Sequence, residues 1–110
     1  MLRIEKTTEN HSEILSLFGE VDASNSVILD EAIQELVDGG SKSILIDGKN
    51  LEYISSAGLG VFMSYLEDFQ ENGISMKICN LVPRVFEVFK ILGLDQLIPI
   101  YRDRAAAFAD

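Results

Sequence analysis

The chain has 110 residues, with 9 Lys and Arg against 18 Asp and Glu, so its formal net charge is −9 with the single His neutral. At this length, 47% hydrophobic residues supply the core of one domain without help from a disulfide or a metal. The acidic balance argues against nucleic-acid binding, which depends on Lys and Arg that neutralise phosphates. We therefore expect one domain over residues 1–110 that binds neither nucleic acid nor an anionic membrane surface.

The sequence also gives an expectation for the cellular compartment. No apolar run reaches the roughly 18 residues that a membrane span needs, and Glu5 and Glu9 lie where a signal peptide would have its apolar core. The single cysteine, Cys79, has no partner for an internal disulfide and is expected to be a small buried residue. These features predict a cytoplasmic protein without membrane insertion.

Partly alternating residues at the beginning of the chain predict a β-hairpin. Its two edge-type strands span residues 2–8 and 13–18, and the polar residues 9–12 separate them. Gly19 is expected to begin a break after the second strand.

The next segment changes from strand-like to helical spacing. An amphipathic helix is predicted from Ser24 onward, and Gly39–Gly40 ends it. The short apolar run 43–47 predicts a buried strand that ends at Asp47. Residues 48–54 are expected to form a loop.

A second helix is predicted over residues 56–72, with Gly73 just beyond its C-terminal end. Its expected core stripe consists of Leu59, Phe62, Met63, Leu66 and Phe69.

The remaining elements continue the alternation of strands and helices. Residues 74–79 predict a strand, and Pro83 lies in the first turn of a third helix that Gly93 ends. The expected apolar face of this helix consists of Val82, Phe86, Phe89 and Leu92. A short strand is expected over 97–101 and a terminal helix over 102–110. This order predicts an α/β fold with a mixed, mostly parallel sheet that begins with the hairpin and has helices packed on it.

Residue patterns typical of enzymes are missing from the sequence. A catalytic triad needs a base beside its nucleophile, and the only histidine, His11, lies in a polar turn. There is no Cys/His metal spacing, no GxGxxG motif and no Walker-type loop. We therefore expect no catalytic residue, no metal and no cofactor.

The most informative stretch is DGKNLEYISSAGLGVF, which runs from Asp47 to Phe62. Ser55 and Ser56 open the second helix, where free N–H groups and the positive end of the helix dipole would stabilise a phosphate. The small residues that follow leave room for another protein to approach. The alternative is that Ser55 or Ser56 only caps the helix.

A second apolar line continues from these serines along the same helix. It consists of Ala57, Val61 and Tyr65 at the spacing i, i+4, i+8. This line is either a docking surface or part of a wider buried stripe.

This stretch resembles the phosphorylation loop of the STAS domain of bacterial anti-sigma factor antagonists, and the resemblance covers essentially the whole chain. The matching residues are Asp47, Leu51, Ile54, Ser55, Ser56, Ala57, Gly58, Leu59 and Gly60. The segment 19–22, Gly-Glu-Val-Asp, resembles the end of the family's second strand. Two positions depart from the family pattern, because Ser55 replaces the usual Asp and Ala57 the usual Ser or Thr.

The resemblance implies roles for individual residues. Ser56 matches the serine that a partner kinase phosphorylates, and Ser55 is a competing acceptor. Asp22 matches an acid close to that serine in the fold, and Asp47 matches the acid that ends the central strand. The expected surroundings of the phosphorylated serine, where a partner binds, are Asp22, Asp47, Ser55, Ala57, Gly58, Val61 and Tyr65.

The resemblance also implies a regulatory cycle without catalysis by this chain. The unphosphorylated protein would bind an anti-sigma factor, itself a serine kinase, and release a sigma factor. Phosphorylation at Ser56 would inactivate the protein, and a PP2C-type phosphatase would restore it. The alternative is a STAS subunit or scaffold of a membrane transport ATPase, or of another signalling complex, without a phosphoswitch. The sequence leaves both a monomer and a homodimer open.

Overall fold

A computed structural model describes all residues from Met1 to Asp110 and contains one five-stranded sheet. Its strands, in spatial order, are β1 (Leu2–Glu9), β2 (Ser12–Val21), β3 (Ser43–Ile54), β4 (Ser75–Cys79) and β5 (Ile100–Tyr101). β1 and β2 form an antiparallel hairpin, and every other neighbouring pair is parallel. This arrangement confirms the expected mixed sheet that begins with a hairpin.

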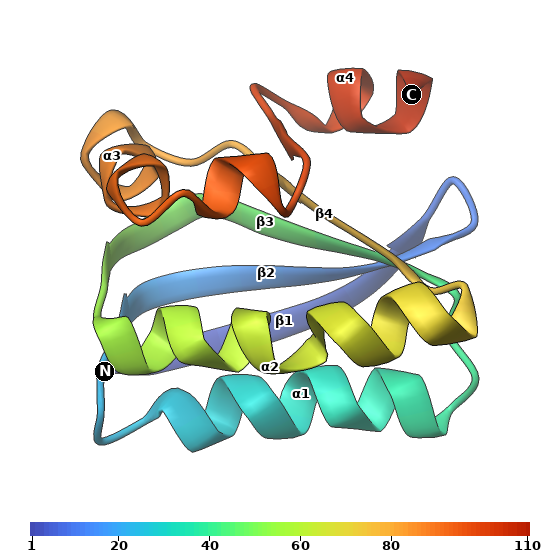
Figure 1. The fold of residues 1–110 in the computed structure, drawn as a ribbon, viewed down its shortest axis with the longest axis horizontal. Coiled ribbons are helices and arrows are strands. Elements are labelled where there is room, and N and C mark those ends of the chain that lie inside the picture. The colour runs from blue at the N-terminus through green and yellow to red at the C-terminus, as the bar shows by residue number, and fades with distance from the viewer.

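Helices cover both faces of the sheet (Figure 1). They are α1 (Ser26–Asp38), α2 (Ser56–Asn72), α3 (Pro83–Ile91), a short 3-10 turn η1 (Leu94–Gln96) and α4 (Arg104–Ala109). α1 and α2 lie side by side on one face, and α4 lies over the opposite face. α3 joins the main core, where the Phe89 ring lies 6.0 Å from the Phe62 ring of α2.

Side-chain alternation along β3 divides the core between these two faces. Ile44 and Ile46 belong to the main core with α1 and α2, whereas Leu45 packs with Cys79 and Ala107 beneath α4. Each of these side chains is at most 2% exposed, and the burial of each isoleucine or leucine contributes about 1.5–3 kcal/mol. The predicted burial of Cys79 is confirmed.

The two central strands are longer than expected. β2 continues through Gly19 to Val21, and β3 includes residues 48–54, which the sequence predicted to be a loop. The strands stay paired because the register shifts twice, between Ser16 and Phe18 and again after Gly19. Gly19 has a φ of +102°, and a Cβ there would lie 2.2 Å from the Met1 carbonyl oxygen. Because β2 lies between β1 and β3, it is an interior strand and not the edge strand that was predicted.

α2 has the predicted bounds and α1 begins two residues later than predicted, at Ser26. One residue of the expected α2 stripe is misplaced. Met63 is 51% exposed, whereas Tyr65 is buried at 7%. The reason is that α1 lies beside α2, so the buried sector of α2 includes the side that faces α1. Gly73 follows α2 in a left-handed conformation with a φ of 67°, as its position predicted.

The apolar face of α3 is rotated relative to the prediction. Val85 and Phe89 are its buried residues, Phe86 is half-buried, and Leu92 lies beyond the helix end with 55% exposure. α3 has this rotation because Phe89 packs against the Phe62 ring of α2.

The C-terminal elements are shorter than predicted. The turn η1 takes up residues 94–96, so only Ile100 and Tyr101 pair with β4. The terminal helix begins at Arg104, because the Asp103 side chain accepts a hydrogen bond from the Ala106 N–H at 2.8 Å. No helix in the structure has both the length and the apolar character needed to cross a membrane.

Candidate functional site

The candidate site lies where β2 and β3 end side by side. Val21 and Ile54 are register partners, and the Ser55 N–H donates to the Val21 carbonyl oxygen at 2.8 Å. The next residues, Asp22 and Ser55, therefore leave neighbouring strand ends. This pairing brings together the segment that ends at Asp22 and the segment that begins at Ser55, which are more than thirty positions apart in sequence.

A hydrogen-bonded turn holds Asp22 in place. Its carboxylate accepts from the Ser24 N–H at 2.9 Å and from the Ser24 hydroxyl at 2.6 Å. The buried Asn25 side chain bridges the turn, accepting from the Asp22 N–H and donating to the Glu20 carbonyl oxygen. The hydroxyl bond from Ser24 lowers the pKa of Asp22, so this residue is a fixed negative charge at neutral pH.

The two serines have different roles at the beginning of α2. Ser55 is the N-cap: its hydroxyl accepts from the Gly58 N–H at 3.4 Å and its carbonyl oxygen from the Leu59 N–H at 3.0 Å. Ser56 is the first helical residue, its side chain is exposed, and its hydroxyl makes no hydrogen bond within the protein. The structure thus assigns the cap to Ser55 and leaves the Ser56 hydroxyl open to solvent.

Close packing of glycine sets the position of the first turn of α2. A Cβ on Gly58 would lie 2.6 Å from Val21 and 2.7 Å from Ile54, so only glycine lets the helix approach both strand ends. Gly60 is different, because it is exposed and a Cβ there would meet nothing within 4 Å. Packing therefore requires glycine at position 58, whereas Gly60 leaves the outer surface of the helix without a side chain at that position.

The second apolar line of α2 does not form one exposed surface. Ala57 and Val61 are half-buried beside the serines. Tyr65 lies in the core against α1, where its hydroxyl contacts the Asp30 carboxylate, and burial together with this hydrogen bond raises its pKa. The expectation that Tyr65 lines a docking surface is therefore wrong, because α1 covers it.

Asp47 is also displaced from the predicted site. It lies within β3, and its bond to Arg104 of α4 places it on the sheet face that α4 covers. α2 covers the other face (Figure 1). Its carboxylate accepts from Arg104 Nε at 2.7 Å, from the Lys49 N–H at 3.0 Å and from Asn80 Nδ2 at 3.2 Å. The ion pair raises the pKa of Arg104. Asp47 thus anchors the C-terminal helix and does not surround Ser56.

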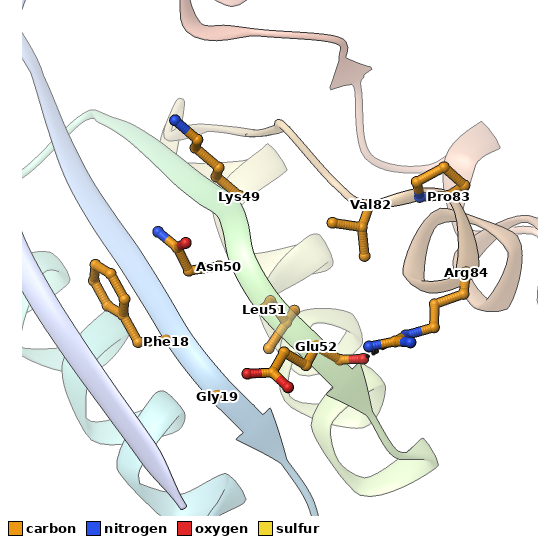
Figure 2. Close-up of a pocket in the computed structure, with 9 residues that line it drawn as sticks. All are labelled: Phe18, Gly19, Lys49, Asn50, Leu51, Glu52, Val82, Pro83 and Arg84. Atoms are coloured by element: carbon orange, nitrogen blue, oxygen red, sulfur yellow. Dashed lines mark hydrogen bonds between the residues drawn. The ribbon is translucent and has the colours of Figure 1, made fainter.

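A separate groove of about 650 Å³ opens between β2, β3 and the beginning of α3 (Figure 2). Phe18, Asn50 and Lys49 line it from the two strands, and Arg84 closes the opposite side by donating from Nε to the Glu52 carbonyl oxygen at 2.9 Å. None of the predicted site residues lines this groove.

At the strand-end site, the exposed Ser56 hydroxyl can accept a transferred group. No set of three or more His, Cys, Asp or Glu side chains is arranged to hold a metal ion. His11 is exposed in the hairpin turn, at the opposite end of β2 from Val21. No histidine is therefore available to activate a nucleophile at this site.

Sequence reasoning missed the residues that support the site. Ser24 and Asn25 hold the Asp22 turn, and Arg104 neutralises Asp47. An Asn directly before a helical pattern marks an N-cap position, which Asn25 occupies, but its side chain bonds to Asp22 and Glu20 and not to the amides of α1. The pairing of Arg104 with Asp47 had no local signal, because 57 positions separate the two residues.

Comparisons with known proteins point in one direction. The STAS domain family model matches residues 3–107. BtrV of Bordetella bronchiseptica, named as an anti-sigma factor antagonist, is 34% identical over 96 residues, which cover 87% of this chain and 83% of that protein. Relatives of this kind are regulatory binding proteins, not enzymes.

Solved structures share the α/β fold. A Thermotoga maritima protein named as an anti-sigma factor antagonist has a TM-score of 0.89 at 20% identity, covering 96% of this chain and 92% of its own. The Bacillus cell fate determinant SpoIIAA, solved in its phosphorylated form, has a TM-score of 0.70 at 18% identity, covering 97% and 96%.

Proposed function

The chain belongs to the STAS domain family, and we propose that it is an anti-sigma factor antagonist controlled by phosphorylation of Ser56. In this proposal the unphosphorylated protein binds an anti-sigma factor, itself a serine kinase, in the cytoplasm and so releases a sigma factor. The kinase inactivates the protein by phosphorylating Ser56, and a PP2C-type phosphatase restores it. The name of the Bordetella relative and the phosphorylated form of SpoIIAA support this proposal.

The observation that carries the proposal is the division of roles between the two serines. Ser55 caps α2 through its hydroxyl and carbonyl oxygen. Ser56 has an exposed hydroxyl with no partner in the protein. A kinase can therefore modify Ser56 without breaking a contact of the fold, whereas a phosphate on Ser55 would disrupt the cap. This difference favours Ser56 over Ser55 as the acceptor.

The position of Ser56 also suits a phosphate electrostatically. The amides of Gly58 and Leu59 are bonded to Ser55, so the first two amides of α2 remain for solvent or an anion. The positive end of the helix dipole lies at the same point. A phosphate there would be held locally without refolding the domain.

Loss of partner binding follows from the charge that the phosphate adds. Ser56, Gly60 and Met63 lie on the outer side of α2, and all three are exposed. A phosphate brings about −1.5 to −2 charges to this surface, at the same strand ends that hold the fixed negative charge of Asp22. A partner that covers the surface would have to desolvate this charge, and each 1.4 kcal/mol lost weakens binding about tenfold.

The second candidate function is a STAS subunit or scaffold of a membrane transport ATPase. In that role Ser56 would be a permanent contact residue and would never be phosphorylated. The two functions predict different effects of a negative charge at Ser56, so one experiment separates them.

The test is affinity capture from a lysate of the native host with Ser56→Ala and Ser56→Asp proteins as baits, followed by mass spectrometry. We expect a serine kinase of the histidine-kinase-like ATPase fold on the Ala bait and its loss from the Asp bait. Gln70→Glu is the matched control, because it adds one negative charge at an exposed position of the same helix. The same partner on both Ser56 baits, or a transporter subunit on both, contradicts the phosphoswitch.

A further inference from the structure

The long free edge of the sheet is the outer side of β1. The order of the strands leaves β1 and β5 at the two edges, and β5 contains only two residues. β1 has eight residues, from Leu2 to Glu9. A free edge presents a row of backbone donors and acceptors to any chain that can pair with it.

The hydrogen-bonding pattern of the hairpin shows which β1 residues point outward. The Glu20 N–H donates to the Met1 carbonyl oxygen at 3.0 Å, so Met1 and Glu20 form a hydrogen-bonded pair. Bonded and non-bonded pairs alternate along an antiparallel ladder, so the odd-numbered residues of β1 bond to β2. The even-numbered residues direct their N–H and C=O groups to the free edge; they are Leu2, Ile4, Lys6 and Thr8.

We infer that the β1 edge pairs with the β1 edge of a second copy of this chain, antiparallel and centred on Ile4. In this register Ile4 faces Ile4, Leu2 faces Lys6, and Arg3 faces Glu5 of the second copy. The outward-pointing even residues meet one another, so each hydrogen-bonded pair exchanges two backbone bonds. The two sheets join into one continuous sheet across a two-fold axis.

Charge complementarity selects this register. Arg3 and Glu5 are both half-exposed on the sheet face away from α1, where they pair with each other within one chain. In the joined sheet each would also lie opposite its oppositely charged counterpart in the second copy, which gives two symmetric ion pairs across the axis. The neighbouring registers would set Glu5 opposite Glu5, Arg3 opposite Arg3 or Lys6 opposite Lys6. Like charges directly opposite each other destabilise a ladder, so the edge rejects these alternatives.

The apolar residues of β1 fit the same register. Leu2 and Ile4 are half-buried and pack against the main core on the α1 face. In the joined sheet, Ile4 of each copy covers the exposed part of the other at a hydrogen-bonded position. Lys6 is exposed, and it extends its stem beside Leu2 of the second copy.

Charge reversal tests both the dimer and its register. Sedimentation velocity of the full chain over a wide concentration range is expected to show a dimer. Arg3→Glu and Glu5→Arg should each be monomeric, because each sets like charges across the axis. An equimolar mixture of the two variants should form a heterodimer, because both acidic side chains of one variant then face the two arginines of the other.

A proline pair provides the matched control for the backbone contacts. Lys6→Pro removes an outward N–H inside the paired segment, on both copies, and should weaken the dimer roughly tenfold or more. Thr8→Pro removes an outward N–H beyond that segment and should leave the dimer intact. Thermal unfolding of each variant verifies its fold. A wild-type chain that stays monomeric throughout, or a dimer that survives both charge reversals, overturns the inference.

Discussion

The guanidinium of Arg104 and the carboxylate of Asp47 lie 2.7 Å apart in the fold, although 57 positions separate them in sequence. Arg104 also donates to Glu9 at 2.9 Å and to Ser16 at 3.3 Å. A single side chain of α4 thus connects the C-terminal helix to the first three strands. Asp47, which the sequence predicted to lie beside the phosphorylated serine, instead attaches α4 to the opposite face of the sheet.

Removing this ion pair should lower stability measurably. Arg104→Ala leaves the Asp47 carboxylate, whose side chain is 7% exposed, without its cationic partner. We expect a loss of about 2 kcal/mol in urea unfolding, below the full value of a buried pair because the Arg104 side chain is 33% exposed. Arg102→Ala is the control, since that side chain is 89% exposed, and should change stability by less than about 0.5 kcal/mol. Equal effects of the two substitutions would contradict the anchoring role.

Alanine substitutions at the two glycines of the motif should change the free energy of unfolding in opposite directions. Gly58→Ala puts a Cβ within 2.6 Å of Val21, so overpacking should destabilise the protein by about 1–3 kcal/mol. Gly60→Ala meets no atom within 4 Å and should stabilise α2 by about 0.5–1 kcal/mol. Thermal and urea unfolding measure both effects. A neutral Gly58→Ala would show that α2 does not pack this closely on the strand ends.

The two serines should differ in stability as they differ in structure. Ser55→Ala removes the N-cap acceptor of Gly58 and should cost about 1 kcal/mol. Ser56→Ala removes an exposed, unbonded hydroxyl and should change the free energy of unfolding by less than about 0.5 kcal/mol. The opposite order in urea unfolding would mean that Ser56 is the structural residue.

Stability should fall at alkaline pH in part through Cys79. Burial raises the pKa of this thiol to about 12, above its usual value of about 8.5. At a pH below the pKa of the thiol in the unfolded chain, this group takes nothing from the free energy of unfolding. As the pH rises from there toward 12, the unfolded chain loses the thiol proton more readily than the folded one, so stability is lost. Cys79→Ala should therefore show a shallower alkaline decline in urea unfolding than the natural chain.

The contribution of Cys79 can be isolated by difference. Tyr65 and Tyr101 also have raised pKa values, and both are present in the two proteins compared. Their effect cancels when the two pH profiles are subtracted. Parallel profiles for the natural chain and Cys79→Ala would contradict the assignment. A thiol reagent should also fail to react with Cys79 until the protein unfolds.

Much of the fold was predictable because local signals and tertiary packing agree. The hairpin, α1 and α2 follow from periodicity, and Gly39 and Gly73 lie directly after the helices that they were expected to end. The resemblance identified the motif, but the distinction between Ser55 and Ser56 required the cap geometry.

The errors arise where distant segments decide the structure. Residues 48–54 begin within the turn-like sequence DGKN, yet they form a strand because the bulged β2 extends far enough to pair with them. Tyr65 is buried because α1 lies beside it, and Asp47 is turned away from α2 because it alternates with Ile46 along β3. No local pattern contains these relationships.

The most direct test of the central claim is site-resolved phosphopeptide mass spectrometry of the protein purified from its native host. The account predicts phosphate on Ser56, its retention in Ser55→Ala and its loss in Ser56→Ala. Phosphate on Ser55, or an unmodified motif while the partner kinase is present and active, would contradict it.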